Sequence, residues 1–317
     1  MARAPFGRFA LGTANLGNLY APVSDEQAHA VLEAAWECGI RYFDTPPHYG
    51  LGLAERRLGT FLSTKAREEF VISTKVGRRL VPNLDGAAGL DDANHFYVPA
   101  DHWRVWDFSA DGVRRSLDAS LARLGLDSVD IAYLHDPDEY DLETALAEGL
   151  PAVAVLRDAG VVSAVGIGSK SVEALAAGAR SGLLELLMVA GRFTLLEQPA
   201  LDDVLPECRA RLWASPPRAC STRACWQRGL RRNRPPMSTA SCRRACSSRR
   251  LRSPPPAPSS TSTCSPRRCT TRCGSRRCRR WSSAQAPEEV RQNERGLHAT
   301  VPAELWTTLR EKGLIRQ

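Results

Sequence analysis

Three short apolar segments of this chain end at residues that can carry a charge or transfer a proton. RYFDTPPHYG contains Asp44 and, five residues later, Tyr49; STKVG contains Lys75; and YLHD contains His135. A nearby ammonium favours the tyrosinate and lowers the phenol pKa from its ordinary value of about 10. Asp44 would keep Lys75 charged and oriented. This combination predicts general acid–base chemistry on an oxygen atom of a bound substrate.

Each of the four residues also has a simpler structural interpretation. Asp44 could be a turn or cap residue, and Tyr49 could be an aromatic residue at the rim. Lys75 could be a solvated cation, and His135 a core histidine. A shared location on one rim would make chemistry the better interpretation. The secondary structure decides whether they share one.

The chain alternates between apolar strands and amphipathic helices. Strands are expected within residues 6–17, 41–45, 69–77, 129–136, 161–169 and 184–193, and helices within 24–39, with Ser24 as N-cap, 53–62, 109–125, 143–160 and 172–182. Residues 78–108 read as a long polar and aromatic loop. Repeated βα units favour a (β/α)8 barrel with its active site at the carboxyl ends of the strands. A doubly wound sheet is the alternative, although no G-x-G-x-x-G turn follows the first strand.

Residues 211–283 differ sharply in composition from the rest of the chain. These 73 residues contain 19 Arg, 14 Ser, 9 Pro, 8 Cys and 6 Thr, and no Asp, Glu, Lys, His, Ile, Val, Phe or Tyr. The remainder holds 24 basic and 35 acidic residues, so the net charge of +8 comes from this block. One interpretation is a non-enzymatic protein with a basic nucleic-acid-binding segment. A zinc module disagrees with the cysteine spacing and with the absence of histidine.

A third interpretation is that the block is translated out of frame. If the true codons begin one base earlier, every Cys or Trp becomes Leu, Val or Met, so eleven residues become core residues. With permitted third bases, residues 213–229 can be read as a strand, a glycine-rich loop and a helix start, and residues 278–284 as another strand. We therefore expect one barrel domain over residues 1–317 whose seventh and eighth strands are disrupted as written. The written chain is expected to aggregate and to be inactive.

The overall composition is that of a globular protein. The chain is 43% apolar and 25% charged, which excludes disordered, collagen-like and membrane-embedded chains. No apolar run approaches the roughly 20 residues of a membrane helix, and the start lacks a signal-peptide core. We expect a cytoplasmic protein with a small-molecule substrate, without a metal, and with neither nucleic acid nor a membrane as partner. The sequence does not indicate an oligomeric state.

The four chemical residues and their surroundings resemble the aldo-keto reductase superfamily. FDTPPHYG, STKVG and YLHD match its pattern of a strand-end Asp, a Tyr five residues later, and strand-end Lys and His. GLGLAERRLG, YLHDPD, VAGRFTLLEQ and VPAELWTTLREKGLI further resemble bacterial dehydrogenases of L-fucose and related D-threo-aldoses. The resemblance implies NAD(P)-dependent oxidation of the C1 hydroxyl of an aldose, with Tyr49 as general acid/base and His135 orienting the substrate oxygen. A pyridoxal 4-dehydrogenase-like enzyme or a general aldehyde reductase is the alternative.

The resemblance also implies a cofactor site along the strand ends. Thr13 and Asp44 follow or end the first two strands, and Ser169 and Lys170 stand where the family usually has Ser-Asn. These four residues are the candidates for the nicotinamide end.

The adenosine end of the cofactor is implied by QAPEEVRQN, which resembles the last phosphate loop of the family. Glu289 stands where many members carry a basic clamp for the 2′-phosphate of NADP, and Asn293 is available to the adenine. A carboxylate repels that phosphate but accepts hydrogen bonds from a ribose diol. NAD is therefore favoured over NADP.

Substrate contacts are expected from His48, Trp103, Trp106 and His135. Sugars present apolar C–H faces as well as hydroxyls, and tryptophan beside polar groups suits both. The alternative for the two tryptophans is a lid that packs on itself.

Overall fold

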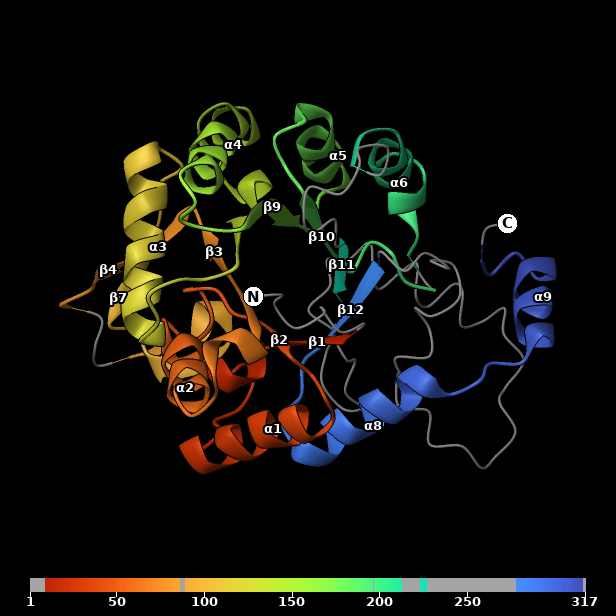
Figure 1. The fold of residues 1–317 in the computed structure, drawn as a ribbon, viewed down its shortest axis with the longest axis horizontal. Helices are drawn as coiled ribbons and strands as arrows, with labels where there is room; N and C mark the ends of the chain where they lie inside the picture. Colours follow the sequence, from red (N-terminus) through yellow and green to blue (C-terminus); the bar gives the residue numbers. More distant parts are fainter. Residues whose placement is uncertain (1–8, 86–88, 196, 213–222, 227–277, 316–317) are drawn as a thin grey trace.

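Eight parallel strands form a closed barrel with helices around it (Figure 1). The computed structural model describes residues 9–85, 89–195, 197–212, 223–226 and 278–315. The strands follow one another around the barrel in the order β1 (Phe9–Gly12), β12 (Cys278–Ser282), β11 (Arg223–Trp226), β10 (Leu186–Ala190), β9 (Ala164–Ser169), β8 (Ile131–His135), β3 (Val71–Val76) and β2 (Tyr42–Asp44). The predicted (β/α)8 barrel is confirmed, and the doubly wound alternative is excluded.

The closure of the barrel corrects one expectation from the sequence. The backbones of β11 and β12 lie between β10 and β1. β11 pairs in parallel with β10, β12 pairs in parallel with β1, and the two pair with each other. The written block thus supplies two short strands where we expected the seventh and eighth strands to be disrupted. The hydrogen bonds between strands use backbone groups that almost every residue carries. Extended segments of unusual composition can therefore still pair with the free edge of a neighbouring strand. β12 falls on the strand expected at 278–284, whereas β11 lies later than the strand expected near 213.

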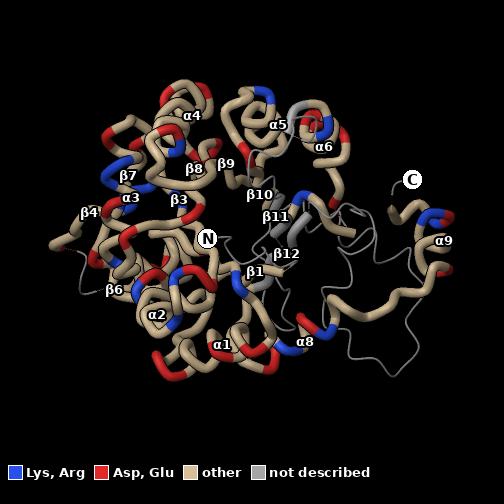
Figure 2. Tube along the Cα trace, viewed as in Figure 1, with Lys and Arg blue, Asp and Glu red and all other residues tan. Residues whose placement is uncertain are grey.

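Helices surround the strands and begin and end at recognisable capping residues. Ser24 forms the full capping box of α1 with Gln27, and Ser109 caps α3, which ends at Gly125 in the left-handed conformation. Acidic and basic positions are interspersed along these helices (Figure 2). The helices are α1 (Asp25–Glu37), α2 (Leu53–Leu62), α3 (Ala110–Leu124), α4 (Leu142–Asp158), α5 (Val172–Ser181), α6 (Val204–Glu207), α8 (Pro287–His298) and α9 (Ala303–Glu311). Within the described ranges, none of them has the length and apolarity to cross a bilayer.

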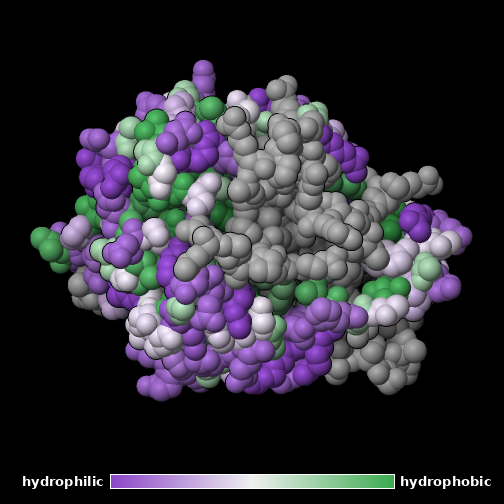
Figure 3. All heavy atoms as spheres, in the orientation of Figure 1, coloured by the Kyte–Doolittle hydropathy of each residue, from purple (hydrophilic) through white to green (hydrophobic). Residues whose placement is uncertain are grey.

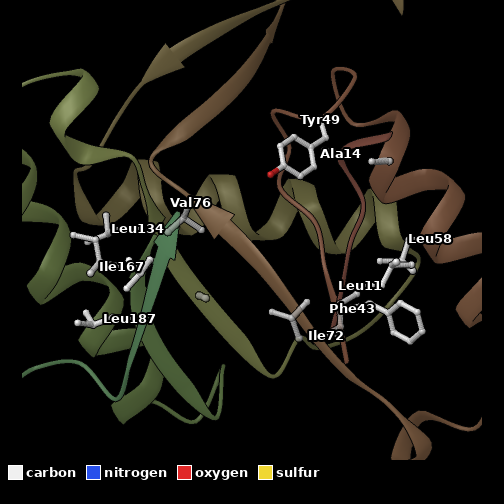
Figure 4. Packing of buried hydrophobic residues seen from close by; sticks show 14 of the residues in the cluster. Leu11, Ala14, Phe43, Tyr49, Leu58, Ile72, Val76, Leu134, Ile167 and Leu187 are labelled. Atoms are coloured by element: carbon white, nitrogen blue, oxygen red, sulfur yellow. The ribbon is translucent and has the colours of Figure 1, made fainter. Parts of the chain in front are cut away.

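Alternate residues of the strands fill the barrel and pack against the helices. The inner cluster consists of Ala10, Tyr42, Val71, Ile131, Tyr133, Ala164, Leu186 and Met188. The outer cluster includes Leu11, Phe43, Ile72, Val76, Leu134, Ile167 and Leu187, together with helix residues such as Leu58 (Figure 4). This period of two follows from the pleat of a strand. Two residues beyond an inner residue, the next side chain also points inward.

The expected long loop after β3 folds into two antiparallel hairpins. β4 (Arg78–Pro82) pairs with β7 (His102–Trp106), and β5 (Leu90–Asp91) pairs with β6 (Phe96–Pro99). Leu84, which follows β4, is 90% exposed. Figure 3 shows hydrophobic groups at the left edge of the molecule, where Figure 1 places β4 and β7. The hairpins place one face of β7 toward the strand ends of the barrel.

Candidate active site

Three of the four chemical residues continue the inward series of their strands to the carboxyl-terminal rim. Asp44 follows Tyr42 by two residues, and Lys75 and His135 end the inward series of β3 and β8. All three are buried, with exposed fractions of 1%, 3% and 6%. The strand period therefore brings the carboxylate, the ammonium and the imidazole to the same end of the barrel.

Asp44 and Lys75 form a buried ion pair. The Lys75 ammonium donates to Oδ2 of Asp44, and the Ser73 hydroxyl donates to Oδ1 at 2.7 Å. Ser73 and Lys75 share the inner face of β3, so one strand supplies both donors. Both carboxylate oxygens are satisfied, which fixes the position of the ammonium in a region that excludes water.

Tyr49 is buried above this ion pair. The Lys75 ammonium lies 5.4 Å from the centroid of the Tyr49 ring. Figure 4 shows the ring beyond the carboxyl end of β3, with its hydroxyl turned toward that strand. The phenol and the cation are thus neighbours, as general acid–base chemistry at the hydroxyl requires.

The loop that carries Tyr49 is held by direct contact between two backbones. A Cβ on Gly17, at the end of η1 (Ala14–Gly17), would lie 2.7 Å from the carbonyl carbon of Tyr49. Gly50 has a φ of +61°, and a Cβ there would lie 2.3 Å from the carbonyl oxygen of Gly17. Only glycine fits at these two positions, so the backbone around Tyr49 approaches its neighbour more closely than side chains would allow.

Thr13 also helps to fix the strand ends. Its backbone N–H and its hydroxyl donate to the carbonyl oxygen of Asp44 at 3.1 and 3.0 Å. Its side chain is fully buried. In this structure Thr13 ties the end of β1 to the end of β2, and its proposed cofactor contact stays a prediction.

His135 and His48 lie edge to face, with ring centroids 5.7 Å apart. Burial holds the pKa of each imidazole well below its ordinary value. Nearby cations lower these pKa values further: Arg104 and Arg78 act on His48, and Arg78 and Lys75 act on His135. Both rings are therefore neutral near pH 7. Nδ1 of His135 has no hydrogen-bond partner within the described residues. A neutral imidazole at this position can hydrogen-bond the oxygen of a substrate.

The two candidate tryptophans have different environments. Trp106 stacks on Phe108 and Tyr140, and the Arg78 guanidinium lies 4.1 Å from its ring centroid. Trp103, on the opposite face of β7, is 61% exposed. The structure places Trp106 against Arg78 and leaves Trp103 on the solvent side of the hairpin.

The candidate nicotinamide contacts lie at the end of β9. The buried Ser169 hydroxyl donates to Asp138 at 2.5 Å and accepts from the backbone N–H of Ser171 at 2.7 Å. The half-exposed Lys170 ammonium lies 3.6 Å from Glu139. Ser169 is thus engaged within the protein, and its proposed contact with the cofactor stays a prediction.

The candidate adenosine contacts lie at the start of α8. Glu289 is in the first turn of this helix, and its carboxylate accepts from the backbone N–H of Gln285 at 2.8 Å. Asn293 lies one turn further along the same helix and is half-buried. The negative charge of Glu289 is fixed at the helix start, where a 2′-phosphate would otherwise find a favourable dipole.

The sequence analysis did not identify three further residues of the site: Arg78, which is buried, and Arg104 and Asp136, which are partly buried. Arg104 donates to both oxygens of Asp91 and, at 3.0 Å, to the carbonyl oxygen of His48. Arg78 pairs with Asp136 and Glu139, so the cluster joins β4 to the end of β8. The signal for Arg104 was the alternation in HWRVW, which places it with Trp106 on one face of β7. Nothing local in the sequence indicates that Arg78 and Asp136 meet.

Comparison with known proteins assigns the family. The model of the aldo/keto reductase family matches residues 8–211, which is more than half of the chain. The chain belongs to the aldo/keto reductase family. The match ends at the first residue of the unusual block.

Two curated relatives share much of the described sequence. A D-threo-aldose 1-dehydrogenase from a Pseudomonas species is 57% identical over 198 residues, which are 62% of this chain and 60% of the relative. A pyridoxal 4-dehydrogenase from Microbacterium luteolum is 39% identical over 218 residues, which are 63% of each chain. The matches thus span less than two thirds of either relative.

Solved structures share the fold at low sequence identity. An aldo-keto reductase from Bacillus halodurans in its holo form superposes with a TM-score of 0.70 and 18% identity, over 98% of this chain and 92% of that one. An aldo/keto reductase from Klebsiella pneumoniae in complex with NADP and acetate has a TM-score of 0.60 and 18% identity over the same shares. These structures support the barrel fold.

Proposed function

We propose that this protein is an NAD(P)-dependent oxidoreductase that oxidises the C1 hydroxyl of an aldose such as L-fucose to the lactone. The observation that carries the proposal is the buried Asp44–Lys75 pair beside the Tyr49 ring, with neutral His135 on the same rim. Family membership and the 57% identity to an aldose dehydrogenase support the same reaction.

The residues of the rim divide the proton chemistry among them. A bound nicotinamide supplies the hydride acceptor. Tyr49 takes the proton of the C1 hydroxyl as the C1–H electron pair leaves and the C1–O double bond forms. Lys75 stabilises the phenolate form that receives this proton, and Asp44 fixes Lys75. His135 hydrogen-bonds the C1 oxygen and holds it toward Tyr49, and in the reducing direction Tyr49 returns the proton.

The donor set of the rim fits a nicotinamide cofactor. His135 Nδ1 and the hydroxyl of Thr45 are buried without partners among the described residues, as expected of a site that receives a polar ligand. Ser169, Lys170 and Thr13 would hold the carboxamide end. Glu289 and Asn293 would hold the adenosine, and the fixed negative charge of Glu289 favours NAD over NADP.

The out-of-frame interpretation belongs to the same proposal. The family match ends at residue 211, where the composition changes. The coding DNA, translated one base earlier from about codon 212, is expected to give Val-Phe-Asn-Ser-Gly after an apolar strand. A Cys220 codon that ends in C would remove this reconstruction.

Steady-state assays with purified protein test the function. The written chain and the re-framed chain are both supplied with NAD or NADP and with L-fucose, pyridoxal or a simple aliphatic aldehyde. Reduction of NAD with L-fucose supports the proposal. Pyridoxal as the better substrate would favour the second candidate, which the 39% identical pyridoxal 4-dehydrogenase supports. Salt-sensitive retention on DNA without redox activity would favour the basic nucleic-acid-binding segment.

A further inference from the structure

Asp136 follows His135 directly and has a strained backbone. Its φ of +42° lies in the left-handed region, which is unfavourable for a residue with a Cβ. Its N–H donates to the carbonyl oxygen of Gly168 at 2.8 Å, and its own carbonyl accepts from Glu139 at 2.9 Å. The end of β9 and the turn after β8 thus force this conformation, and it turns the Asp136 side chain back toward His135.

The Asp136 carboxylate is largely buried but only weakly paired. Oδ2 lies 3.3 Å from Nη2 of Arg78 and 3.5 Å from Nε2 of His135, and no described residue donates to Oδ1. Burial raises the pKa of Asp136 to about 6, against the lowering effect of Arg78. A desolvated carboxylate with an open oxygen is unfavourable unless another donor completes its hydrogen bonds.

Arg78 holds the carboxylate in place from a third direction. It lies over Trp106, donates to Glu139, and its Nη1 is 3.4 Å from Nδ1 of His48. The elements after β2, β3 and β8 therefore meet at one guanidinium. Because Arg78 is 8% exposed in its side chain, Asp136 has little freedom to turn away from the site.

We propose that Asp136 is a specificity-determining residue whose carboxylate accepts a hydrogen bond from the substrate hydroxyl on the carbon next to the reacting carbon. This rests on the proposed function, in which His135 binds the reacting oxygen. Two oxygens on adjacent carbons lie about as far apart as two hydrogen-bonded atoms. Oδ2 of Asp136 lies 3.5 Å from Nε2 of His135, so the carboxylate and the imidazole stand side by side and can contact neighbouring groups of one substrate. The substrate class is thus a 2-hydroxylated aldose, and an analogue without that hydroxyl leaves the carboxylate unpaired.

The test compares L-fucose with 2-deoxy-L-fucose in the unmodified protein and in Asp136→Asn. The written and the re-framed chains are both assayed with NAD. In the unmodified protein, kcat/KM is expected to be roughly tenfold to a hundredfold higher for L-fucose, the range of a hydrogen bond to a charged group. Asp136→Asn is expected to remove most of this preference by lowering kcat/KM for L-fucose. Asp136→Ala, which removes the acceptor, should remove at least as much.

Glu139→Gln is the matched control, because it also removes one negative charge beside Arg78 but does not contact His135. It should change kcat/KM for both sugars by a similar factor. Equal losses on both sugars in Asp136→Asn, or no preference in the unmodified protein, would overturn the assignment of Asp136. If Asp136→Asn does not fold, the preference of the unmodified protein decides alone. Absence of NAD reduction with either sugar and either chain would instead remove the proposed function and this proposal with it.

Discussion

Two buried carboxylate–cation pairs lie on opposite faces of β3. On the inner face Lys75 pairs with Asp44, and on the outer face Thr74 donates at 2.9 Å to Glu55, whose other oxygen accepts from Arg123 at 2.6 Å. Glu55 is fully buried between α2, α3 and β3. The Arg123 guanidinium donates to Glu55 and Ser120, whereas the Lys75 ammonium faces the Tyr49 ring.

This difference shows that burial of a charge pair does not by itself define a site. Both carboxylates are removed from water, and each accepts two hydrogen bonds. The outer pair connects helices to a strand, so its removal should affect folding. The inner pair lies at the rim beside a phenol, so changes next to it should affect turnover.

Glu55→Ala should give the largest loss of stability. It leaves the Arg123 charge and the Thr74 hydroxyl without their buried partner, which costs about 3–5 kcal/mol in the free energy of unfolding. Urea unfolding of the re-framed chain measures the loss. Glu55→Gln, which keeps an oxygen for Thr74, should lose less. A loss below about 1 kcal/mol would mean that the outer pair contributes little.

Tyr49→Phe should lower turnover with L-fucose by about two or more orders of magnitude, because the proton of the C1 hydroxyl loses its acceptor. The urea midpoint and NAD binding, followed by fluorescence, should stay close to those of the unmodified protein. Tyr97→Phe, at a half-exposed tyrosine of the hairpins, is the control and should change neither quantity. Unchanged turnover in Tyr49→Phe would remove the assigned role.

The pH dependence of sugar preference should follow Asp136. Below a pKa of about 6 the protonated carboxyl no longer accepts as an anion, so kcat/KM for L-fucose relative to 2-deoxy-L-fucose should fall as the pH drops through 6. Arg78 and Lys170 oppose this raised pKa, Glu139 and Asp138 add to it, and His48 and His135 stay neutral. In Asp136→Asn the ratio should be flat. A ratio that titrates equally in both proteins would contradict the assignment.

The same raised pKa has an opposite consequence for stability. The folded protein binds the Asp136 proton more tightly than the unfolded chain, whose carboxyl titrates near 3.8. The contribution of this group to stability therefore falls as the pH rises from about 3.8 to about 6.

Arg114→Ala should have the smallest effect. Arg114 and Asp118 form an i, i+4 pair on α3 with both side chains about half exposed. Water screens such a pair, so its removal should cost only about 0.3–0.5 kcal/mol. The same urea titration measures it, with Arg114→Lys as the control that keeps the charge. A loss of stability equal to that of Glu55→Ala would show that burial does not determine how much an ion pair contributes to the free energy of unfolding.

The sequence predicted those features that depend on local periodicity. Lys75 and His135 could be placed because a strand alternates its faces, and Ser24 because a capping serine followed by Gln27 is a local signal. The hairpins after β3 were read as a loop because their strands are short and several of their apolar positions, such as Trp103 and Val105, face solvent. Arg78 and Asp136 were missed because they meet only when β4 and the end of β8 come together.

The contact between Gly17 and Gly50 makes the position of the proton-transferring group a property of the main chain. No rotamer change in the neighbouring side chains can relax that contact, because no side chain takes part in it. A single methyl group at either glycine would therefore displace the Tyr49 oxygen by forcing the two loops apart, without altering any residue that performs the chemistry. Inactivating changes at these two positions would look, in any survey of variants, like defects in packing.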